Sequence, residues 1–355
     1  MDKRWIQLAN ILVNYSTKVQ PGERVMISMR ETHTLPLVKA VYQACIENGA
    51  YPQVQFLSDY LDRILMIDGN HEQITRVPDI EAYGMEWADV YFGLRGAHNL
   101  YEFSDVRPEV LADYRKVMGT ISSLRWEKTR WVIVRVPNED FAQQAETDVE
   151  TITDLFFDAC LQDWSAETLR WEKLADQLNQ GSEFHLIAKG TDLRFSTRGR
   201  KWMVGDGRYN MPDGEIFTAP VEKSVNGYMA FEFPGVLGGR LVPNIKLKWE
   251  NGELIQATAS DNEDFLQQII SADEGAGKVG EFAFGTNYSI DRFCKDIFYD
   301  EKIGGTIHIA LGRAYPICGG TNQSKIHWDI IKDTRLEGEV YMDGRKVFEK
   351  GKFLF

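Results

Sequence analysis

Several features that mark large classes of protein are absent from this sequence. It contains no run of Lys and Arg, and its formal net charge is −13. We expect no nucleic-acid partner, because such binding depends on clustered basic side chains that release counterions from phosphates. No apolar run approaches membrane-spanning length, and the N-terminal residues are charged at once and lack a signal-peptide core. We therefore expect a cytoplasmic protein with no membrane partner.

Cysteine is scarce, and its spacing shows none of the close pairs that mark metal or redox motifs. The chain has four cysteines, which lie far apart and mostly in apolar surroundings: Cys45, Cys160, Cys294 and Cys318. No Cys-x-x-Cys spacing occurs among them. We expect buried free thiols in a reducing compartment.

Nucleotide-binding motifs are missing from the N-terminal half, although its pattern is typical of nucleotide-binding folds. Helical stretches alternate here with apolar runs of strand type, at residues 24–28, 52–57, 88–94 and 131–136. This alternation predicts a mostly parallel sheet that helices cover on both faces, a Rossmann-like arrangement. Neither G-x-G-x-x-G nor a P-loop follows any of these strands, so the fold is expected without the cofactor.

The second half has a different texture, in which short strand-like runs dominate from residue 184 onwards. The turn sequences ENGE (250–253) and MDGR (342–345) are strong hairpin signals. A chain of 355 residues also exceeds the usual size of a single core. We predict a Rossmann-like α/β domain at 1–182 and a mainly antiparallel α+β domain, barrel-like or sandwich-like, at 183–355.

Two of the six histidines lie in one segment, 304–329, which has the pattern of buried strands. In GTIHIALG the isoleucines alternate with His308, so a strand directs His308 away from the apolar layer. In KIHWDII, His327 and Asp329 stand at i and i+2 and share one face of a strand. Imidazole and carboxylate groups together suit zinc, cobalt or manganese. The spacing alone leaves open the alternative of ordinary hydrogen-bonded core residues.

Two glutamates in unusual settings are candidates for further ligands. Glu215 follows a tight Pro-Asp-Gly turn at the start of a strand, although a solvated turn carboxylate would look the same. Glu281 is a lone acid between a glycine-rich stretch and an apolar run, a costly position unless the acid is paired or metal-bound. Three further histidines have no acidic or histidine neighbour at ligand spacing and are expected in loops or at the surface: His33, His71 and His98.

Several motifs of the second half resemble a known family when they are taken in order. They are PDGEIFTAP (212–220), VGEFAFGTN (279–287), DEKIGGTIHIALG (300–312), AYP (314–316), GGTNQS (319–324) and IHWD (326–329). This combination is similar to the aminopeptidase T family of thermophilic metallo-aminopeptidases, which includes aminopeptidase S. The motifs cover most of residues 205–335, whereas the first 180 residues resemble the family only through the order of strands and helices.

The resemblance implies a dinuclear metal centre with two divalent ions of zinc, cobalt or manganese. Five residues correspond to the family's ligands, among which Glu281 is the bridging and catalytic carboxylate: Glu215, Glu281, His308, His327 and Asp329. Tyr315 of the AYP motif corresponds to the active-site tyrosine, with core packing beside Ile317 as the alternative. Glu301 is a candidate acid/base group or a group behind the ligands, with a surface salt bridge as the alternative.

The resemblance further implies a metal-dependent aminopeptidase that removes N-terminal residues from short peptides, and a homodimer. Two such ions activate a water and polarise the scissile carbonyl, and a free α-amine can bind one of them. Peptides with a free N-terminus are therefore the expected substrates. Two alternatives stay open: another dinuclear hydrolase, such as an amidase or esterase, and a non-catalytic binding protein with a structural metal cluster.

Overall fold

The computed structural model describes residues 2–96, 99, 101–125 and 128–355. The chain divides into two compact units, and each unit is made of two stretches of the chain. The first is Met1–Gln162 with Gly207–Pro212, and the second is Asp163–Asp206 with Asp213–Phe355.

The first stretch of unit one ends at Gln162, and unit two begins at Asp163. The domain boundary near residue 182 that the sequence indicates stays a prediction. Helix α9 (Trp164–Leu178) belongs to the second unit because it packs against strands β7 (Met203–Gly205) and β9 (Glu215–Thr218) of that unit. The segment Gly207–Pro212 belongs to the first unit because its strand β8 (Asn210–Met211) pairs with a strand of that unit.

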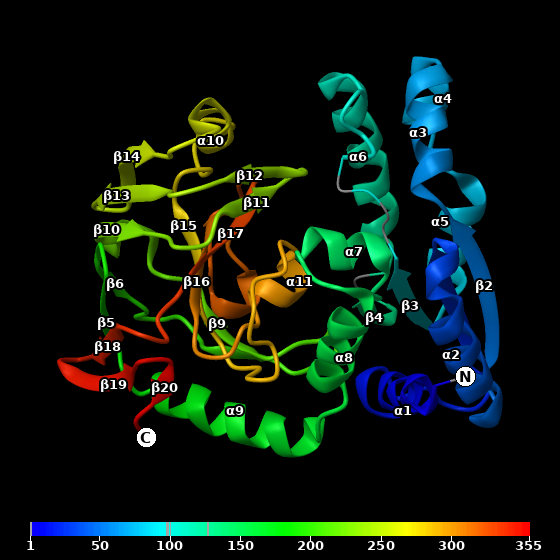
Figure 1. The fold of residues 1–355 in the computed structure, drawn as a ribbon, viewed down its shortest axis with the longest axis horizontal. Coiled ribbons are helices and arrows are strands. Elements are labelled where there is room, and N and C mark those ends of the chain that lie inside the picture. Colours follow the sequence, from blue (N-terminus) through cyan, green and yellow to red (C-terminus); the bar gives the residue numbers. More distant parts are fainter. Residues whose placement is uncertain (1, 97–98, 100, 126–127) are drawn as a thin grey trace. The chain divides into compact units, whose positions relative to one another are not determined.

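The first unit is built on a five-stranded parallel sheet with the order β2-β1-β3-β4-β8. Besides β8, its strands are β1 (Arg24–Arg30), β2 (Tyr51–Leu57), β3 (Val90–Arg95) and β4 (Arg130–Arg135). The three inner strands β1, β3 and β4 contain long runs of buried residues. Such runs are typical of parallel sheets that are covered on both faces. The predicted Rossmann-like α/β arrangement is confirmed (Figure 1).

Helices connect and surround these strands. In the described part of this unit the α-helices are α1 (Lys3–Ile11), α2 (Leu35–Glu47), α3 (Asp59–Asp68), α4 (His71–Thr75), α5 (Asp79–Trp87), α6 (Pro108–Ser123), α7 (Glu139–Gln144) and α8 (Val149–Cys160). A π-helical turn (Leu12–Ser16) and a 3₁₀ turn (Thr32–Thr34) lie between them. α6 begins at Pro108 because the fixed φ of proline suits the first turn of a helix. α7 was not predicted, since its six residues are too few for a periodic pattern. It begins where the Asn138 side chain accepts a hydrogen bond from the Phe141 backbone N–H.

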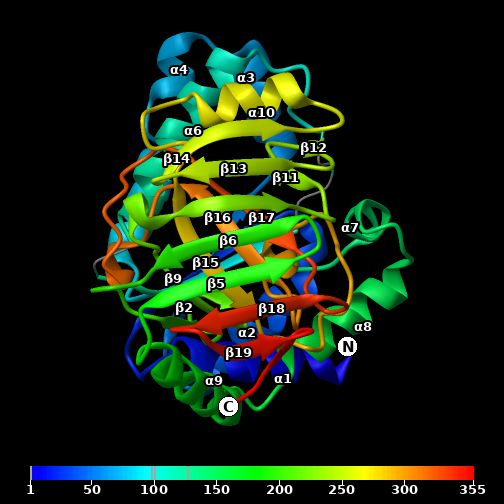
Figure 2. The same cartoon turned by 90° about the vertical axis from the view of Figure 1, so that its left-hand side faces the viewer.

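The second unit contains an eight-stranded antiparallel sheet, called sheet B here, with the order β14-β13-β10-β6-β5-β18-β19-β20 (Figure 2). Its strands are β5 (Glu183–Ala188), β6 (Thr191–Ser196), β10 (Asn226–Ala230), β13 (Lys246–Glu250), β14 (Glu253–Thr258), β18 (Gly338–Met342), β19 (Arg345–Glu349) and β20 (Lys352–Phe353). Both predicted hairpins are present. The turn residues Asn251 and Gly252 have φ of 51° and 81°, as a two-residue turn with positive φ at both positions requires.

A second antiparallel sheet, called sheet C here, has the order β17-β16-β15-β9-β7. Its strands besides β7 and β9 are β15 (Val279–Gly285), β16 (Ile307–Gly312) and β17 (His327–Lys332). Aromatic side chains join the two sheets: the Phe195 and Phe282 rings lie 4.6 Å apart, and those of Phe284 and Phe348 lie 5.0 Å apart. The predicted antiparallel domain is confirmed. Of the two forms considered, barrel-like and sandwich-like, it has the sandwich-like one.

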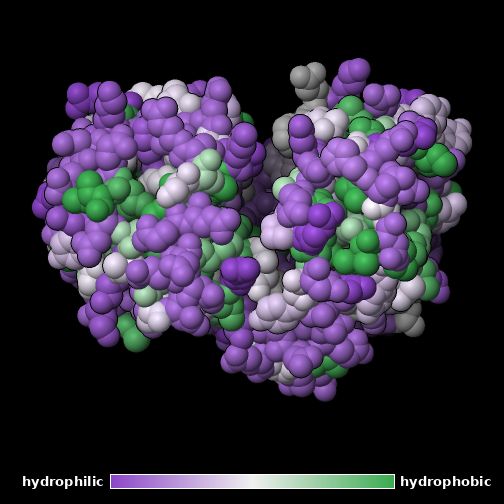
Figure 3. All heavy atoms as spheres, turned by 90° about the horizontal axis from the view of Figure 1, so that it is seen from above, coloured by the Kyte–Doolittle hydropathy of each residue, from purple (hydrophilic) through white to green (hydrophobic). Residues whose placement is uncertain are grey.

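The remaining elements of the second unit are short. They are the ribbon β11 (Gly235–Leu237) and β12 (Arg240–Val242), the helices α10 (Glu263–Ile270) and α11 (Ile297–Asp300), and two 3₁₀ turns at Glu222–Ser224 and Pro316–Cys318. Among the described residues, no helix is both long and apolar enough to cross a bilayer. Hydrophilic residues cover most of the face drawn in Figure 3, and hydrophobic ones form smaller separate groups there.

Candidate metal centre

One face of sheet C carries all the predicted ligands. Glu281 on β15 and Asp329 on β17 both lie opposite Ala310 of the strand between them. Glu215, the first residue of β9, lies opposite Gly285 of β15. Residues that are directly opposite each other in an antiparallel sheet point to the same side. The carboxylates therefore converge from three different strands.

The two histidines join the carboxylates on this face. His308 on β16 lies opposite Ala283, and His327 on β17 lies opposite Gly312. The alternate residues of β15, such as Phe282, pack toward sheet B instead. On this face, most of the residues opposite the candidate ligands are alanine or glycine. Their small side chains leave space above the sheet in which metal ions could bind.

A β-bulge orients Glu281. The pairing of β15 with β16 shifts between Val279 and Glu281, so Gly280 stands out of register. A Cβ atom at Gly280 would lie 2.2 Å from the Gly312 carbonyl oxygen, so no other residue fits there without movement of the backbone. Bulges of this kind redirect side chains next to functional sites.

The first group of candidate ligands consists of Glu215, Glu301 and His308, each of which offers an atom within 4.8 Å of the others. His308 Nε2 lies 3.3 Å from Glu215 Oε2. The His308 side chain has no exposed surface, and neither of its ring nitrogens nor Glu215 Oε2 has a hydrogen-bond partner in the described part of the chain. Buried polar atoms are almost always satisfied in proteins, so these atoms indicate a further binding partner.

The second group consists of Glu281, His327 and Asp329, each of which offers an atom within 4.8 Å of the others. His327 Nδ1 lies 2.8 Å from the backbone carbonyl oxygen of Arg313. A carbonyl only accepts hydrogen bonds, so Nδ1 carries the proton and Nε2 keeps its lone pair. Nε2 faces the acids, at 3.5 Å from Glu281 Oε2 and 3.7 Å from Asp329 Oδ2.

Glu281 connects the two groups. Its Oε1 lies 3.7 Å from His308 Nε2, while its Oε2 lies 3.5 Å from His327 Nε2. Each carboxylate oxygen therefore faces a different histidine. Glu281 therefore lies between the two candidate ligand groups.

The donor atoms fit divalent metal ions. Each group offers imidazole nitrogen and carboxylate oxygen with no thiolate, a set that suits zinc, cobalt or manganese. The burial of four neighbouring carboxylates is costly in free energy unless cations compensate their negative charge. The His308 ring nitrogens and Glu215 Oε2, which have no hydrogen-bond partner among the described residues, are also available to bind an ion.

Residues 1–353 match the family described as thermophilic metalloprotease (M29). The chain belongs to this family. This membership makes it a metal-dependent peptidase and confirms the resemblance that the sequence motifs indicate.

Known proteins similar to this metalloprotease are named as aminopeptidases. Aminopeptidase 2 of Geobacillus stearothermophilus is 23% identical over 100% of this chain and 98% of its own length. Aminopeptidase T of Thermus aquaticus is 27% identical over 87% of this chain and 84% of its own. The solved structure of wild-type AmpT from Thermus thermophilus has a TM-score of 0.89 at 22% identity and covers 99% of each chain, which shows a shared fold.

Burial and charge shift the pKa values of the candidate ligands. Burial raises the pKa of Glu215, but Lys302 and His308 outweigh it and bring that pKa down to about 2. Burial raises the pKa of Glu301 to about 8, although Lys302 opposes it. Burial lowers the pKa of His308, but the carboxylates of Glu215 and Glu281 outweigh it and raise that pKa. Protons held in this way are displaced when metal ions bind.

Tyr315 lies beside the second group without belonging to it. Its hydroxyl lies 3.4 Å from His327 Nε2, and its ring packs edge-on against Phe217 at 5.8 Å. Burial and the nearby carboxylates raise the pKa of Tyr315, so the phenol keeps its proton. The alternative of core packing beside Ile317 is wrong, because Ile317 is 63% exposed.

One charged residue of the site, Lys302, was not predicted from the sequence. Lys302 is completely buried, and its Nζ lies 2.8 Å from Glu215 Oε1 and 3.6 Å from Asp213 Oδ1. Lys302 Nζ also contacts Glu301, whose side chain is largely buried. The alternative that Glu301 forms a salt bridge at the surface is therefore wrong. The sequence signal was the charged triplet Asp-Glu-Lys (300–302) a few residues before an apolar strand, because a lysine buried there needs acidic partners.

The other predicted histidine positions lie away from these groups. His71 is 80% exposed at the start of α4, and His33 lies in a 3₁₀ turn 3.7 Å from Glu139. Both match the expected loop or surface positions. His98 lies outside the described residues.

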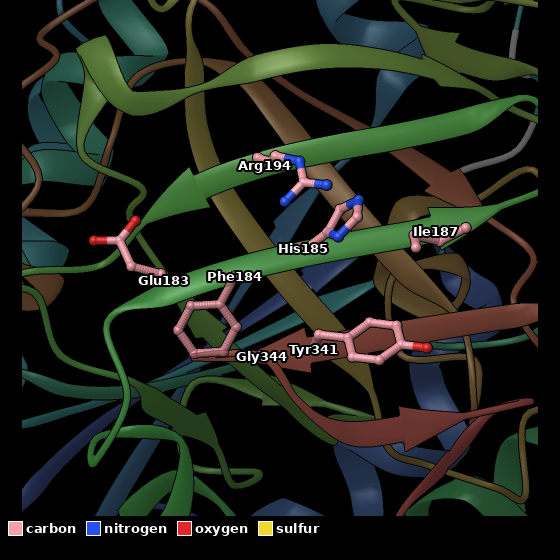
Figure 4. A pocket seen from close by; sticks show the side chains of 7 residues that line it. All are labelled: Glu183, Phe184, His185, Ile187, Arg194, Tyr341 and Gly344. Atoms are coloured by element: carbon pink, nitrogen blue, oxygen red, sulfur yellow. The ribbon is translucent and has the colours of Figure 1, made fainter.

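A separate pocket of about 250 Å³ lies on the face of sheet B that points away from sheet C (Figure 4). In it, His185 Nε2 lies 2.9 Å from Asp192 Oδ1. None of the predicted site residues lines this pocket. Its lining residues are Glu183, Phe184, His185, Ile187, Arg194, Tyr341 and Gly344.

Proposed function

We propose that this metalloprotease is an aminopeptidase that removes N-terminal residues from short peptides with two divalent ions. The observation that carries the proposal is the position of Glu281 between His308 and His327, with one oxygen toward each. Two ligand groups that share one carboxylate are what a dinuclear hydrolase needs. The names of the similar aminopeptidases support the choice of reaction.

The ligand assignment follows the two groups. We propose that Glu215, Glu301 and His308 hold one ion, that His327 and Asp329 hold the other, and that Glu281 bridges them. Zinc, cobalt and manganese are the proposed ions because the donors are nitrogen and oxygen only. Glu301 thereby becomes a sixth ligand beside the five that the resemblance implies.

The catalytic roles follow from chemistry and position. When bound, such a pair of ions would lower the pKa of a shared water and polarise the scissile carbonyl. Tyr315 keeps its phenolic proton and points it toward the cluster, where it can donate to the oxyanion of the tetrahedral intermediate. The carbonyl of Arg313 holds the His327 ring in one orientation and one tautomer.

Specificity for a free N-terminus follows from the proposed ions. Four carboxylates meet here, whereas Lys302 is the one lysine or arginine that pairs with any of them within the described residues. Two divalent ions would balance the charge of these four carboxylates, so a peptide α-amine would be recognised through its lone pair, as a ligand, and not as a cation. The lone pair of an acylated amine is delocalised into the carbonyl group, so we propose short peptides with free N-termini as substrates.

A panel of matched substrates tests this proposal. Aminoacyl amides and short peptides should be cleaved by the metal-loaded protein, and their N-acetylated counterparts should be poor substrates. Equal kcat/KM for free and acetylated substrates would identify a general amidase or esterase instead. A protein that binds metal firmly but cleaves none of these substrates would be a binding protein with a structural cluster.

Location and assembly complete the proposal. We propose a cytoplasmic protein, since Cys45, Cys160, Cys294 and Cys318 are buried free thiols. We propose a homodimer on the basis of the family resemblance. Exposed apolar side chains on the sheet-edge strand β2, such as Val54 and Phe56, are suitable for covering by a second copy. Light scattering at several concentrations tests the assembly.

A further inference from the structure

Lys302 lies at the centre of a buried charge cluster. Its side chain has no exposed surface, and it pairs with three carboxylates, those of Asp213, Glu215 and Glu301. Two of these three residues belong to the first candidate ligand group. A buried lysine is costly, and here all its partners come from the metal centre or from the turn that precedes β9.

We propose that Lys302 is a positioning residue that assigns the two oxygens of Glu215, holding Oε1 and leaving Oε2 for a metal ion. The inference rests on the proposed metal pair. Lys302 Nζ lies 2.8 Å from Oε1, whereas Oε2 has no hydrogen-bond partner among the described residues and lies 3.3 Å from His308 Nε2. The ammonium is a compact charge that can engage one oxygen and still reach Glu301.

The backbone around Lys302 is held in place. The Asn287 backbone N–H donates to the Lys302 carbonyl oxygen at 3.1 Å. The Asn287 side-chain amide donates to the Asp213 carbonyl oxygen at 2.8 Å. One residue of the VGEFAFGTN motif therefore ties the lysine to the turn that precedes Glu215. These bonds hold the Lys302 backbone close to the backbone two residues before Glu215, from which Lys302 Nζ reaches Oε1.

The two ligand groups differ in this respect. Within the described part of the chain, none of Glu281, His327 and Asp329 pairs with a lysine or arginine. If Lys302 assigns ligand atoms, its loss should weaken one metal site and spare the other. If Lys302 only balances charge for folding, its loss should lower stability without such a difference between the sites.

The test compares two buried lysines. Lys332 is also fully buried, and its Nζ lies 2.7 Å from both Glu232 Oε1 and the Lys189 carbonyl oxygen, so its partners are not candidate ligands. Lys302→Met, Lys332→Met and the wild type are stripped of metal and titrated with zinc or cobalt by calorimetry. We expect two ions in the wild type and in Lys332→Met, at matching affinities.

For Lys302→Met we expect one ion at the wild-type affinity and the other bound about 10- to 100-fold more weakly, the usual effect of losing a group that orients a ligand. Adding Asp329→Ala to Lys302→Met should then remove the remaining ion. Two ions bound as in the wild type by Lys302→Met would overturn the inference while the proposed metal pair stands. A wild type that binds no divalent ion would overturn both.

A second variant keeps the test decisive if Lys302→Met does not fold. Lys302→Arg retains the positive charge, but its planar fork tends to engage both oxygens of a carboxylate. We expect Lys302→Arg to melt close to the wild type and still to bind one of the two ions at least about 10-fold more weakly. Wild-type affinity for both ions in Lys302→Arg would show that charge alone is sufficient and would overturn the positioning role.

Discussion

The Tyr315 hydroxyl lies 3.4 Å from His327 Nε2, and the two rings lie 5.1 Å apart. The tyrosine is thus next to the ligands but outside both ligand groups. Pro316 begins a 3₁₀ turn directly after it, and the Phe217 ring packs edge-on against it. The phenol is held where it can act on a substrate without holding a metal.

Tyr315→Phe should lower kcat by about 10²- to 10³-fold, which is the usual loss for one donor to an oxyanion. The phenylalanine ring keeps the contact with Phe217, and His327 keeps its bond to the Arg313 carbonyl, so metal content and folding should not change. Steady-state kinetics and metal analysis of the same preparation check this. Ile317→Ala, at an exposed neighbouring position, is the control and should retain full activity. A kcat within a few-fold of wild type for Tyr315→Phe would remove the phenol from the mechanism.

Removal of the metal ions should abolish activity and also lower thermal stability. The buried carboxylates of Glu215, Glu281 and Asp329 repel one another when no metal ion lies among them, and Lys302 pairs with Glu215 alone of these three. Ions that bind only the folded state stabilise it by about 2.7 kcal/mol at a concentration 100-fold above Kd. Melting curves with EDTA, and after addition of zinc, cobalt or manganese, measure the change. Full activity after exhaustive chelation would contradict the proposed centre.

The stability of the first unit should depend on pH through Asp89. This carboxylate accepts hydrogen bonds from the Arg24 side chain and backbone, which lower its pKa to about 2. A lowered folded pKa means that the stabilisation is complete above the unfolded pKa of about 3.9 and is lost as the pH falls toward 2.

Asp89→Asn tests this dependence. The variant should be less stable than the wild type at pH 7, by less than about 1 kcal/mol because the pair is partly exposed. The difference should shrink as the pH falls below 4. Denaturant unfolding of both proteins between pH 7 and pH 2 measures it, and a difference that stays constant over this range would show that the carboxylate charge is not the cause.

The sequence predicted those residues of the candidate centre whose own strand shows a recognisable pattern. The alternation around His308 and the i, i+2 spacing of His327 and Asp329 specify a shared face within single strands. The antiparallel register of β16 and β17 then brings those faces together. The hairpin turns were predictable for the same reason, because Asn-Gly and Asp-Gly specify their own backbone conformation.

The parts that the sequence did not predict depend on contacts between distant segments. Lys302 became a central residue because β9 pairs with β15, which brings Glu215 into reach of a lysine that follows α11. Glu301 joined the first ligand group through the same contacts. The sequence shows that these residues are charged and lie beside apolar stretches, but their partners are set by the order of strands in sheet C.

Asn322 of the GGTNQS motif should hold the connection between β16 and β17 in its active shape. Its side-chain amide donates to the Gly312 carbonyl oxygen at 2.6 Å and to the Gly275 carbonyl oxygen at 2.9 Å. Gly312 precedes Arg313, whose carbonyl orients His327. Asn322→Ala leaves both carbonyls without this donor, so it should destabilise the second unit by roughly 1–3 kcal/mol and lower kcat/KM. Denaturant unfolding and peptide kinetics measure both effects. Gln323→Ala, at the exposed next residue, should behave as wild type, and equal behaviour of the two variants would show that the amide bridge is dispensable.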